Sequence, residues 1–243
     1  MHMSKDNRIA VLIDADNVSD KYIKYILDEV SNDGTATYKR IYGDWTKPVL
    51  GSWKNVLLDN SIIPVQQYGY TTGKNATDSA MIIDAMDILY SGNVDGFCIV
   101  SSDSDFTRLA ARLRESGMLV LGMGEKKTPT AFISACNKFK YLEILAQPAE
   151  TVSATQRRTE EMTPLETVKN AVLSIMDEIS DEDEWVSISE IGSRLNKRYP
   201  DFDVRNYGFR KLTPFIKSLG ILDIRSVPVN EGNSRLVYVK VRS

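Results

Sequence analysis

The sequence contains a single histidine, His2, and only two cysteines, Cys98 and Cys136, which do not form a Cys-x-x-Cys pattern. Catalysis by histidine and zinc sites built from histidine or paired cysteine are therefore excluded. Both cysteines stand among apolar residues, so we expect buried free thiols in a reducing compartment.

Long apolar segments and an excess of positive charge are also missing. No apolar run approaches the roughly 18–20 residues of a membrane span, and residues 1–6 lack the apolar core of a signal peptide. We therefore expect a cytoplasmic protein with no membrane partner. Because the net charge is −3, any contact with nucleic acid must come from a local basic region.

Strands and helices are predicted to alternate along residues 8–145. Short apolar runs typical of strands buried on both faces occur at residues 9–13, 36–42, 62–66, 97–100 and 119–122. Segments of helical character lie between and after them, at residues 21–30, 49–58, 79–90, 106–116 and 130–137. This alternation predicts the α/β class, with a Rossmann-like parallel sheet sandwiched by helices.

A change of composition separates a second domain. Residues 147–163 are rich in Pro, Ala, Thr, Ser, Gln and Glu, which is typical of a linker. We predict a first domain at 7–147, a linker at 148–163 and a second domain at 164–243. Its patterns indicate helices at 165–179, 189–198 and 206–219, a short strand at 185–187 and a closing hairpin at 222–227 and 235–241. Three helices and a hairpin are the elements of a small winged helix-turn-helix domain.

Aspartates follow two of the predicted strands. Asp14 ends the first apolar run, Asp103 and Asp105 follow the run at 97–100, and Asp78 stands near the start of a predicted helix. The carboxyl ends of parallel strands form the ligand crevice of an open sheet, so we expect these carboxylates to converge. Oxygen ligands without histidine or paired cysteine favour Mg²⁺ or Mn²⁺, either of which can activate water and bind a phosphodiester.

Two neighbouring polar residues fit the same chemistry. Asn17 can supply a neutral oxygen ligand or orient a phosphate, and Lys74 can offset charge on the phosphate or in the transition state. A simpler interpretation is helix capping, which suits Asp78 or Asp105 taken singly but requires a coincidence for all four aspartates. The role of Asp16 stays open, and Asp84 is expected to be solvated or supporting.

The segments that carry the aspartates resemble those of a known family. The elements Ile13-Asp14-Ala15-Asp16-Asn17, Lys74-x-x-x-Asp78 and Ser101-Ser102-Asp103-Ser104-Asp105-Phe106 are similar to those of the NYN domain, in the PIN-like superfamily of metal-dependent nucleases. The resemblance covers about residues 8–145 and implies a PIN-like α/β sandwich that binds Mg²⁺ or Mn²⁺ and hydrolyses RNA. Carried over by position, it assigns metal binding to Asp14, Asp78, Asp103 and Asp105, supported by Asn17 and the hydroxyls of Ser101, Ser102 and Ser104.

Two other functions use the same residues. Asp14-x-Asp16-x-Val18 also fits the first motif of haloacid-dehalogenase-like phosphatases, although Ser101-Ser102 followed at once by Asp103 merges two motifs that should be far apart. The alternative from a different class is a non-catalytic RNA-binding or scaffolding regulator that retains the acidic pocket.

The second domain carries a local basic region with interleaved aromatic residues, a mixture that suits RNA. Its segments Trp185–Leu195 and Pro200–Leu212, with the element Tyr207-Gly208-Phe209-Arg210-Lys211-Leu212, resemble the LOTUS or OST-HTH domain over about residues 164–241. The resemblance implies a winged helix that binds RNA, or in some members a protein partner. It places Arg205, Tyr207, Arg210 and Lys211 on the recognition helix, with a structural role for Tyr207-Gly208 as the alternative.

Overall fold

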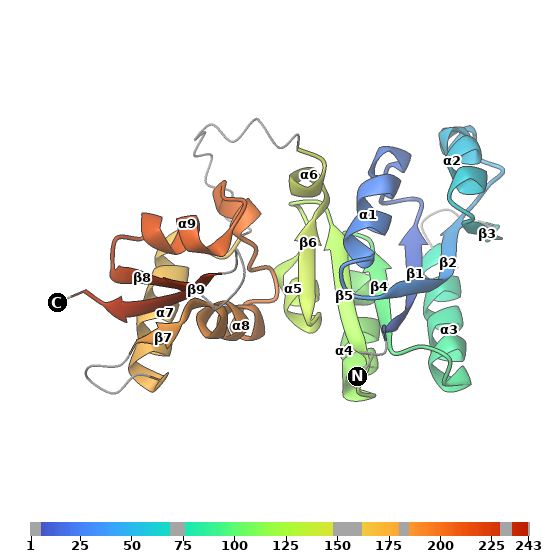
Figure 1. Ribbon diagram of the computed structural model, residues 1–243. Helices are drawn as coiled ribbons and strands as arrows, with labels where there is room; N and C mark the ends of the chain where they lie inside the picture. Colours follow the sequence, from blue (N-terminus) through green and yellow to red (C-terminus); the bar gives the residue numbers. More distant parts are fainter. Residues whose placement is uncertain (1–5, 69–75, 148–161, 180–184, 229–234, 243) are drawn as a thin grey trace. The chain divides into compact units, whose positions relative to one another are not determined.

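The chain forms two compact units, Met1–Gln147 and Pro148–Ser243 (Figure 1). The computed structural model describes residues 6–68, 76–147, 162–179, 185–228 and 235–242. Each unit has its own hydrophobic core.

The first unit is built on a six-stranded, fully parallel sheet with the order β3-β2-β1-β4-β5-β6. Its strands are β1 (Arg8–Asp14), β2 (Thr35–Gly43), β3 (Ile63–Gln66), β4 (Gly96–Val100), β5 (Leu119–Gly124) and β6 (Lys138–Tyr141). The five predicted strands and their parallel arrangement are confirmed. The edge strand β6 was not predicted.

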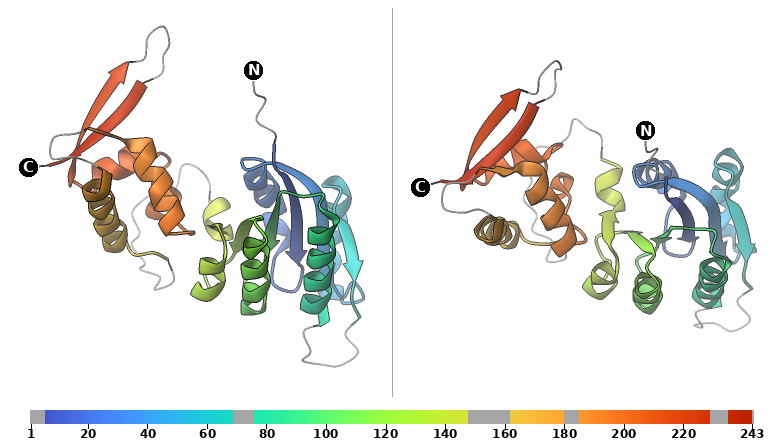
Figure 2. Two further views of the ribbon diagram at one scale, coloured as in Figure 1. Left: turned by 90° about the horizontal axis from the view of Figure 1, so that it is seen from below. Right: turned by 60° about the horizontal axis from the view of Figure 1, so that its bottom comes forward.

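Helices cover both faces of this sheet (Figures 1 and 2). On one face lie α1 (Ile23–Val30), α2 (Trp53–Asp59) and α6 (Leu142–Leu145). On the other lie α3 (Ala76–Ser91), α4 (Thr107–Glu115) and α5 (Thr130–Ala135). Val11 in β1 packs with Ile26 of α1 in the core of the first face, and its neighbour Leu12, on the opposite side of the strand, is equally buried. Two covered faces explain why the central strands are continuous apolar runs.

The strand order reverses at one position along the sheet. The chain moves outward from β1 to β3 and then returns to place β4 on the other side of β1. In an open parallel sheet, ligands bind beyond the carboxyl ends of the strands at this reversal. Asp14 is the last residue of β1, and the segment after β4 begins at Ser101. The topology therefore brings both predicted acidic segments to the carboxyl ends of β1 and β4, where the strand order reverses.

The second unit combines three helices with a small antiparallel sheet of order β7-β9-β8. These elements are α7 (Leu165–Ile179), β7 (Val186–Ser187), α8 (Ile188–Arg198), α9 (Leu212–Ser218), β8 (Leu222–Pro228) and β9 (Arg235–Val241). The helix predicted at 206–219 is wrong over its first part, because α9 begins at Leu212. A short 3-10 helix, η4 (Val204–Tyr207), precedes it and ends at Gly208, whose φ of 83° is readily adopted by glycine.

Candidate functional site

Asp14 is fully buried at the end of β1, and its carboxylate accepts three hydrogen bonds. Its Oδ2 accepts hydrogen bonds from Asn17 Nδ2 (2.7 Å) and Ser101 Oγ (2.8 Å), while its Oδ1 accepts one from the backbone N–H of Asp16 (3.0 Å). Burial raises the pKa of Asp14, and the hydrogen bonds from Asn17 and Ser101 oppose that rise. Asn17 and Ser101 therefore both donate hydrogen bonds to Asp14, and their part in metal binding stays a prediction.

The segment after β4 turns sharply and presents two further carboxylates. The backbone N–H of Asp103 donates to Ser101 Oγ over 3.1 Å, and Asp103 Oδ1 accepts from the N–H of Asp105 over 3.0 Å. Asp103 is thus the N-cap of the short 3-10 helix η3 (Ser104–Phe106), and Asp105 lies exposed in its first turn. Capping therefore belongs to Asp103 and does not account for Asp105.

Asp78 completes the acidic cluster and lies in the first turn of α3. It is only 9% exposed to solvent. Among the described residues, one carboxylate oxygen each from Asp78, Asp103 and Asp105 lie within 4.8 Å of one another. Burial and then the charges of Asp14, Asp103, Asp105 and Asp16 raise the pKa of Asp78 to about 6.

This cluster of Asp78, Asp103 and Asp105 has the chemistry of a divalent-cation site. Its donors are all oxygens, which suit Mg²⁺ or Mn²⁺ better than zinc. Burial and, after it, repulsion between the carboxylates raise the pKa of Asp78, and a bound cation relieves this repulsion. Asp14 lies outside this group of three, but its charge acts on Asp78.

The other predicted site residues take several places. Ser102 Oγ accepts a hydrogen bond from the N–H of Glu125 over 2.8 Å, so it fixes the loop after β5. Ser104 is exposed in η3. Lys74 lies outside the described residues.

Two aspartates, Asp16 and Asp84, make contacts that were not predicted from the sequence. Asp16 Oδ2 accepts a hydrogen bond from Thr77 Oγ1 (3.1 Å), and its Oδ1 lies 3.6 Å from Lys47 Nζ. Asp84, expected to be solvated or supporting, bonds Arg40 and the Tyr42 hydroxyl of β2, which joins α3 to the sheet. All of these contacts join segments far apart in the sequence, so no local pattern indicated them.

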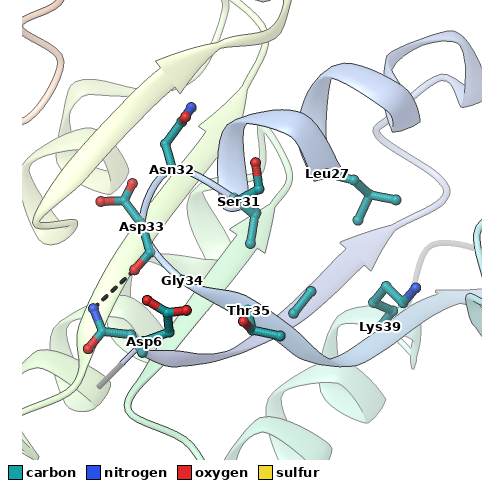
Figure 3. A pocket seen from close by; sticks show the side chains of 11 residues that line it. Asp6, Leu27, Ser31, Asn32, Asp33, Gly34, Thr35 and Lys39 are labelled. Atoms are coloured by element: carbon teal, nitrogen blue, oxygen red, sulfur yellow. Dashed lines mark hydrogen bonds between the residues drawn. The ribbon is translucent and has the colours of Figure 1, made fainter. Parts of the chain in front are cut away.

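A separate pocket lies at the other end of the strands of the same sheet. It has a volume of about 560 Å³ and is lined by residues on both sides of the turn between α1 and β2, together with Asn7 (Figure 3). These residues stand at the amino ends of β1 and β2, away from Asp14 at the carboxyl end of β1. The pocket is therefore distinct from the acidic cluster.

In the second unit, Tyr207 contacts the interior rather than standing on a helix surface. Its hydroxyl donates to the carbonyl of Thr163 over 2.8 Å, and its ring packs against Phe202 and Phe215. Burial raises the pKa of its hydroxyl. This geometry supports the structural alternative for Tyr207.

The three predicted basic contacts are exposed: Arg205 in η4, Arg210 before α9, and Lys211 as the N-cap of α9. Arg205 also forms an ion pair with Asp203 over 2.6 Å. The placement of all four residues on the recognition helix is wrong, because they precede α9.

Comparison with known proteins agrees with this architecture. The profile of the NYN domain matches residues 8–143, which is more than half of the chain. The chain belongs to the NYN domain family. The profile of the OST-HTH/LOTUS domain matches residues 163–233, so both resemblances are confirmed.

Two solved structures are similar to parts of the chain. One is a protein of unknown function from Vibrio parahaemolyticus, with 19% identity and a TM-score of 0.47 over 58% of this chain and 96% of that chain. The other is an uncharacterized protein from Nitrosomonas europaea, with 23% identity and a TM-score of 0.28 over 40% of this chain and 91% of that chain. No curated protein matches the chain.

The two families define the class of function. The NYN domain belongs to the PIN-like nuclease superfamily, and its partner in this chain is an RNA-binding type of domain. An RNA-related, nuclease-like function follows from this combination. None of the helices formed by the described residues has the length and apolar character needed to span a membrane.

Proposed function

We propose that this chain is a Mg²⁺- or Mn²⁺-dependent ribonuclease that hydrolyses RNA phosphodiester bonds in its NYN domain. The proposal rests on one observation: Asp78, Asp103 and Asp105 approach within 4.8 Å at the strand-order reversal of a nuclease-like fold. Asp14 lies at the same edge and adds a fourth negative charge.

Each polar residue has a defined part in this proposal. Asp78, Asp103 and Asp105 hold the cation, and Asp14 keeps the site negative while Asn17 and Ser101 fix its carboxylate. When bound, a divalent cation supplies an activated water and neutralises negative charge on the phosphate. We assign Lys74 to the phosphate on the basis of its charge and its place in the family motif.

The OST-HTH/LOTUS domain recruits the RNA in this proposal, with Arg205, Arg210 and Lys211 as phosphate contacts. All three are exposed and lie within seven positions of one another in the chain, as a backbone-binding surface requires. Tyr207 keeps the supporting segment in place through its bond to Thr163.

The proposal is tested with the full chain and labelled single-stranded and structured RNA, in Mg²⁺, Mn²⁺ or EDTA. Cleavage is expected with either metal and not in EDTA, and Asp103→Asn should lower it at least about a hundredfold. Asparagine is itself a good N-cap, so this substitution preserves η3. Asp87→Asn, an exposed carboxylate on α3 outside the cluster, is the matched control.

Tight RNA binding without cleavage in any metal would overturn the enzyme and favour the non-catalytic regulator. The phosphatase alternative requires Asp14 to be an accessible nucleophile. Asp14 is instead fully buried, and both its carboxylate oxygens accept hydrogen bonds.

A further inference from the structure

Lys47 places a positive charge at the rim of the acidic cluster. It follows β2 and is the N-cap residue of the short 3-10 helix η2 (Pro48–Ser52). Its Nζ lies 3.6 Å from Asp16 Oδ1, and its side chain is 50% exposed. Asp16 also accepts a hydrogen bond from Thr77, the residue before Asp78. Lys47 is therefore connected through Asp16 to the start of α3, where the cluster begins.

Side-chain hydrogen bonds connect the loop that carries Lys47 to the neighbouring strand. Asp44 Oδ1 accepts hydrogen bonds from Thr46 Oγ1 (2.6 Å) and Gln66 Nε2 (3.0 Å). The Trp45 indole N–H donates to the Val65 carbonyl over 3.1 Å. The bonds to Gln66 and Val65 join the loop to β3, so Lys47 follows a segment that is anchored to the sheet.

A negative substrate needs such a cation near this site. The carboxylates of Asp14, Asp16, Asp103 and Asp105 all act on Asp78, so this edge of the sheet repels a phosphate that is not neutralised. An exposed ion pair such as Lys47–Asp16 contributes little to stability, which allows the ammonium group to exchange its carboxylate partner for a phosphate.

We propose that Lys47 binds a backbone phosphate of single-stranded RNA next to the scissile one, and that it exchanges its contact with Asp16 for this phosphate. This inference rests on the proposed ribonuclease function and extends it to substrate positioning. Because the contact is to a neighbouring phosphate, it strengthens substrate binding without taking part in bond cleavage.

The test compares Lys47→Ala and Lys47→Arg with Arg112→Ala in the full chain. Arg112 is a matched control, because its side chain is 51% exposed and forms one ion pair, 3.7 Å from Glu115. It lies in the last turn of α4, a helix that leaves the carboxyl end of β4 and finishes before the amino end of β5. Thermal unfolding of each variant verifies that the fold is retained.

With single-stranded RNA as substrate, Lys47→Ala should raise KM roughly three- to tenfold and leave kcat within about twofold. The slope of log(kcat/KM) against log[salt] should become shallower by about 0.7, the value for one phosphate contact on a single strand. Lys47→Arg keeps the positive charge and should have the KM of the parent. Arg112→Ala should match the parent in both KM and salt slope.

Failure of this inference is distinguishable from failure of the proposed function. If the parent cleaves RNA and Lys47→Ala leaves KM and the salt slope unchanged, the positioning role is wrong and the ribonuclease stands. A fall in kcat at constant KM would also overturn it. If no metal supports cleavage, RNA affinity measured against salt for the same variants in an Asp103→Asn background still tests the contact.

Discussion

The hydroxyl of Ser101 donates a hydrogen bond of 2.8 Å to Oδ2 of the buried Asp14. It joins the ends of β1 and β4, the two strands between which the strand order reverses. Ser101 Oγ also accepts a hydrogen bond from the backbone N–H of Asp103. A single hydroxyl thus connects the buried carboxylate to the segment that carries the acidic cluster.

Ser101→Ala should destabilise the protein and weaken metal binding together. Loss of a hydrogen bond to a buried carboxylate costs about 1.5–3 kcal/mol of unfolding free energy, and the pKa of Asp14 should rise further. Denaturant unfolding and Mn²⁺ titration measure the two effects. Ser104→Ala, on the exposed surface of η3, should leave both unchanged, and equal losses in the two variants would contradict the role given to Ser101.

Metal affinity should depend on pH through Asp78. Its pKa of about 6 means that the carboxylate gains a proton as the pH falls below 6, and the protonated form is a poor ligand. Affinity for Mn²⁺ should therefore be high at pH 7.5 and fall steeply between pH 6.5 and about 5. Calorimetric titration across this range measures the effect, and an affinity that stays constant down to pH 5 would contradict it.

The same shift predicts that Asp78→Asn stabilises the metal-free protein at neutral pH. The native pKa of about 6 is above the ordinary 3.8, so between these values the native state binds more protons than the unfolded state. Stability from this group is present below pH 3.8 and is lost as the pH rises through 6. Removing the charge should restore about 1–2 kcal/mol at pH 7.5. Chemical denaturation in EDTA measures it, with Asp87→Asn expected to be neutral.

Asp84→Ala should loosen α3 from the sheet. The substitution removes the partner of Arg40 and the acceptor of the fully buried Tyr42 hydroxyl, at a cost of about 1–3 kcal/mol of unfolding free energy. Denaturant unfolding measures the cost, and hydrogen exchange should show less protection in α3. Unchanged exchange in α3 would mean that this contact does not anchor the helix.

Tyr207→Phe should affect stability rather than RNA binding. It loses the hydrogen bond to the Thr163 carbonyl, worth about 1 kcal/mol, and keeps the ring contacts with Phe202 and Phe215. The double variant Arg210→Ala/Lys211→Ala should have the opposite effect. It should weaken RNA binding and leave the thermal stability unchanged. Fluorescence anisotropy and thermal unfolding separate the two effects. If Tyr207→Phe abolished binding in a fully folded protein, Tyr207 would be a direct contact.

The sequence predicted the central strands well because each is a short apolar run buried on both faces. The edge strand β6 has the sequence Lys138-Phe139-Lys140-Tyr141, in which lysines alternate with buried aromatic residues as in a strand, but four residues are too short a run for this period to stand out. The helix predicted at 206–219 was interrupted because Gly208 adopts a positive φ, which helical spacing of apolar residues does not reveal.

Part of the candidate site was predictable from the expected parallel sheet. Asp14 and Asp103 follow strands whose order in a parallel sheet brings their ends together, so their convergence follows from topology. The contact of Asp16 with Lys47 depends on the conformation of two loops, and that of Asp84 with Arg40 depends on how α3 rotates against β2. Neither is encoded in a local pattern.

The segment Tyr207-Gly208-Phe209 carries much of the likeness to the OST-HTH/LOTUS family. All three residues nevertheless have structural roles inside the domain. Tyr207 is bonded to Thr163, Gly208 provides a left-handed turn, and Phe209 packs on Phe215. Such a motif stabilises the fold of the domain. It places no constraint on the exposed side chains around it, which can therefore vary. Proteins that share it can therefore differ in the nucleic acids they select, and ligand preference must be established separately for each member.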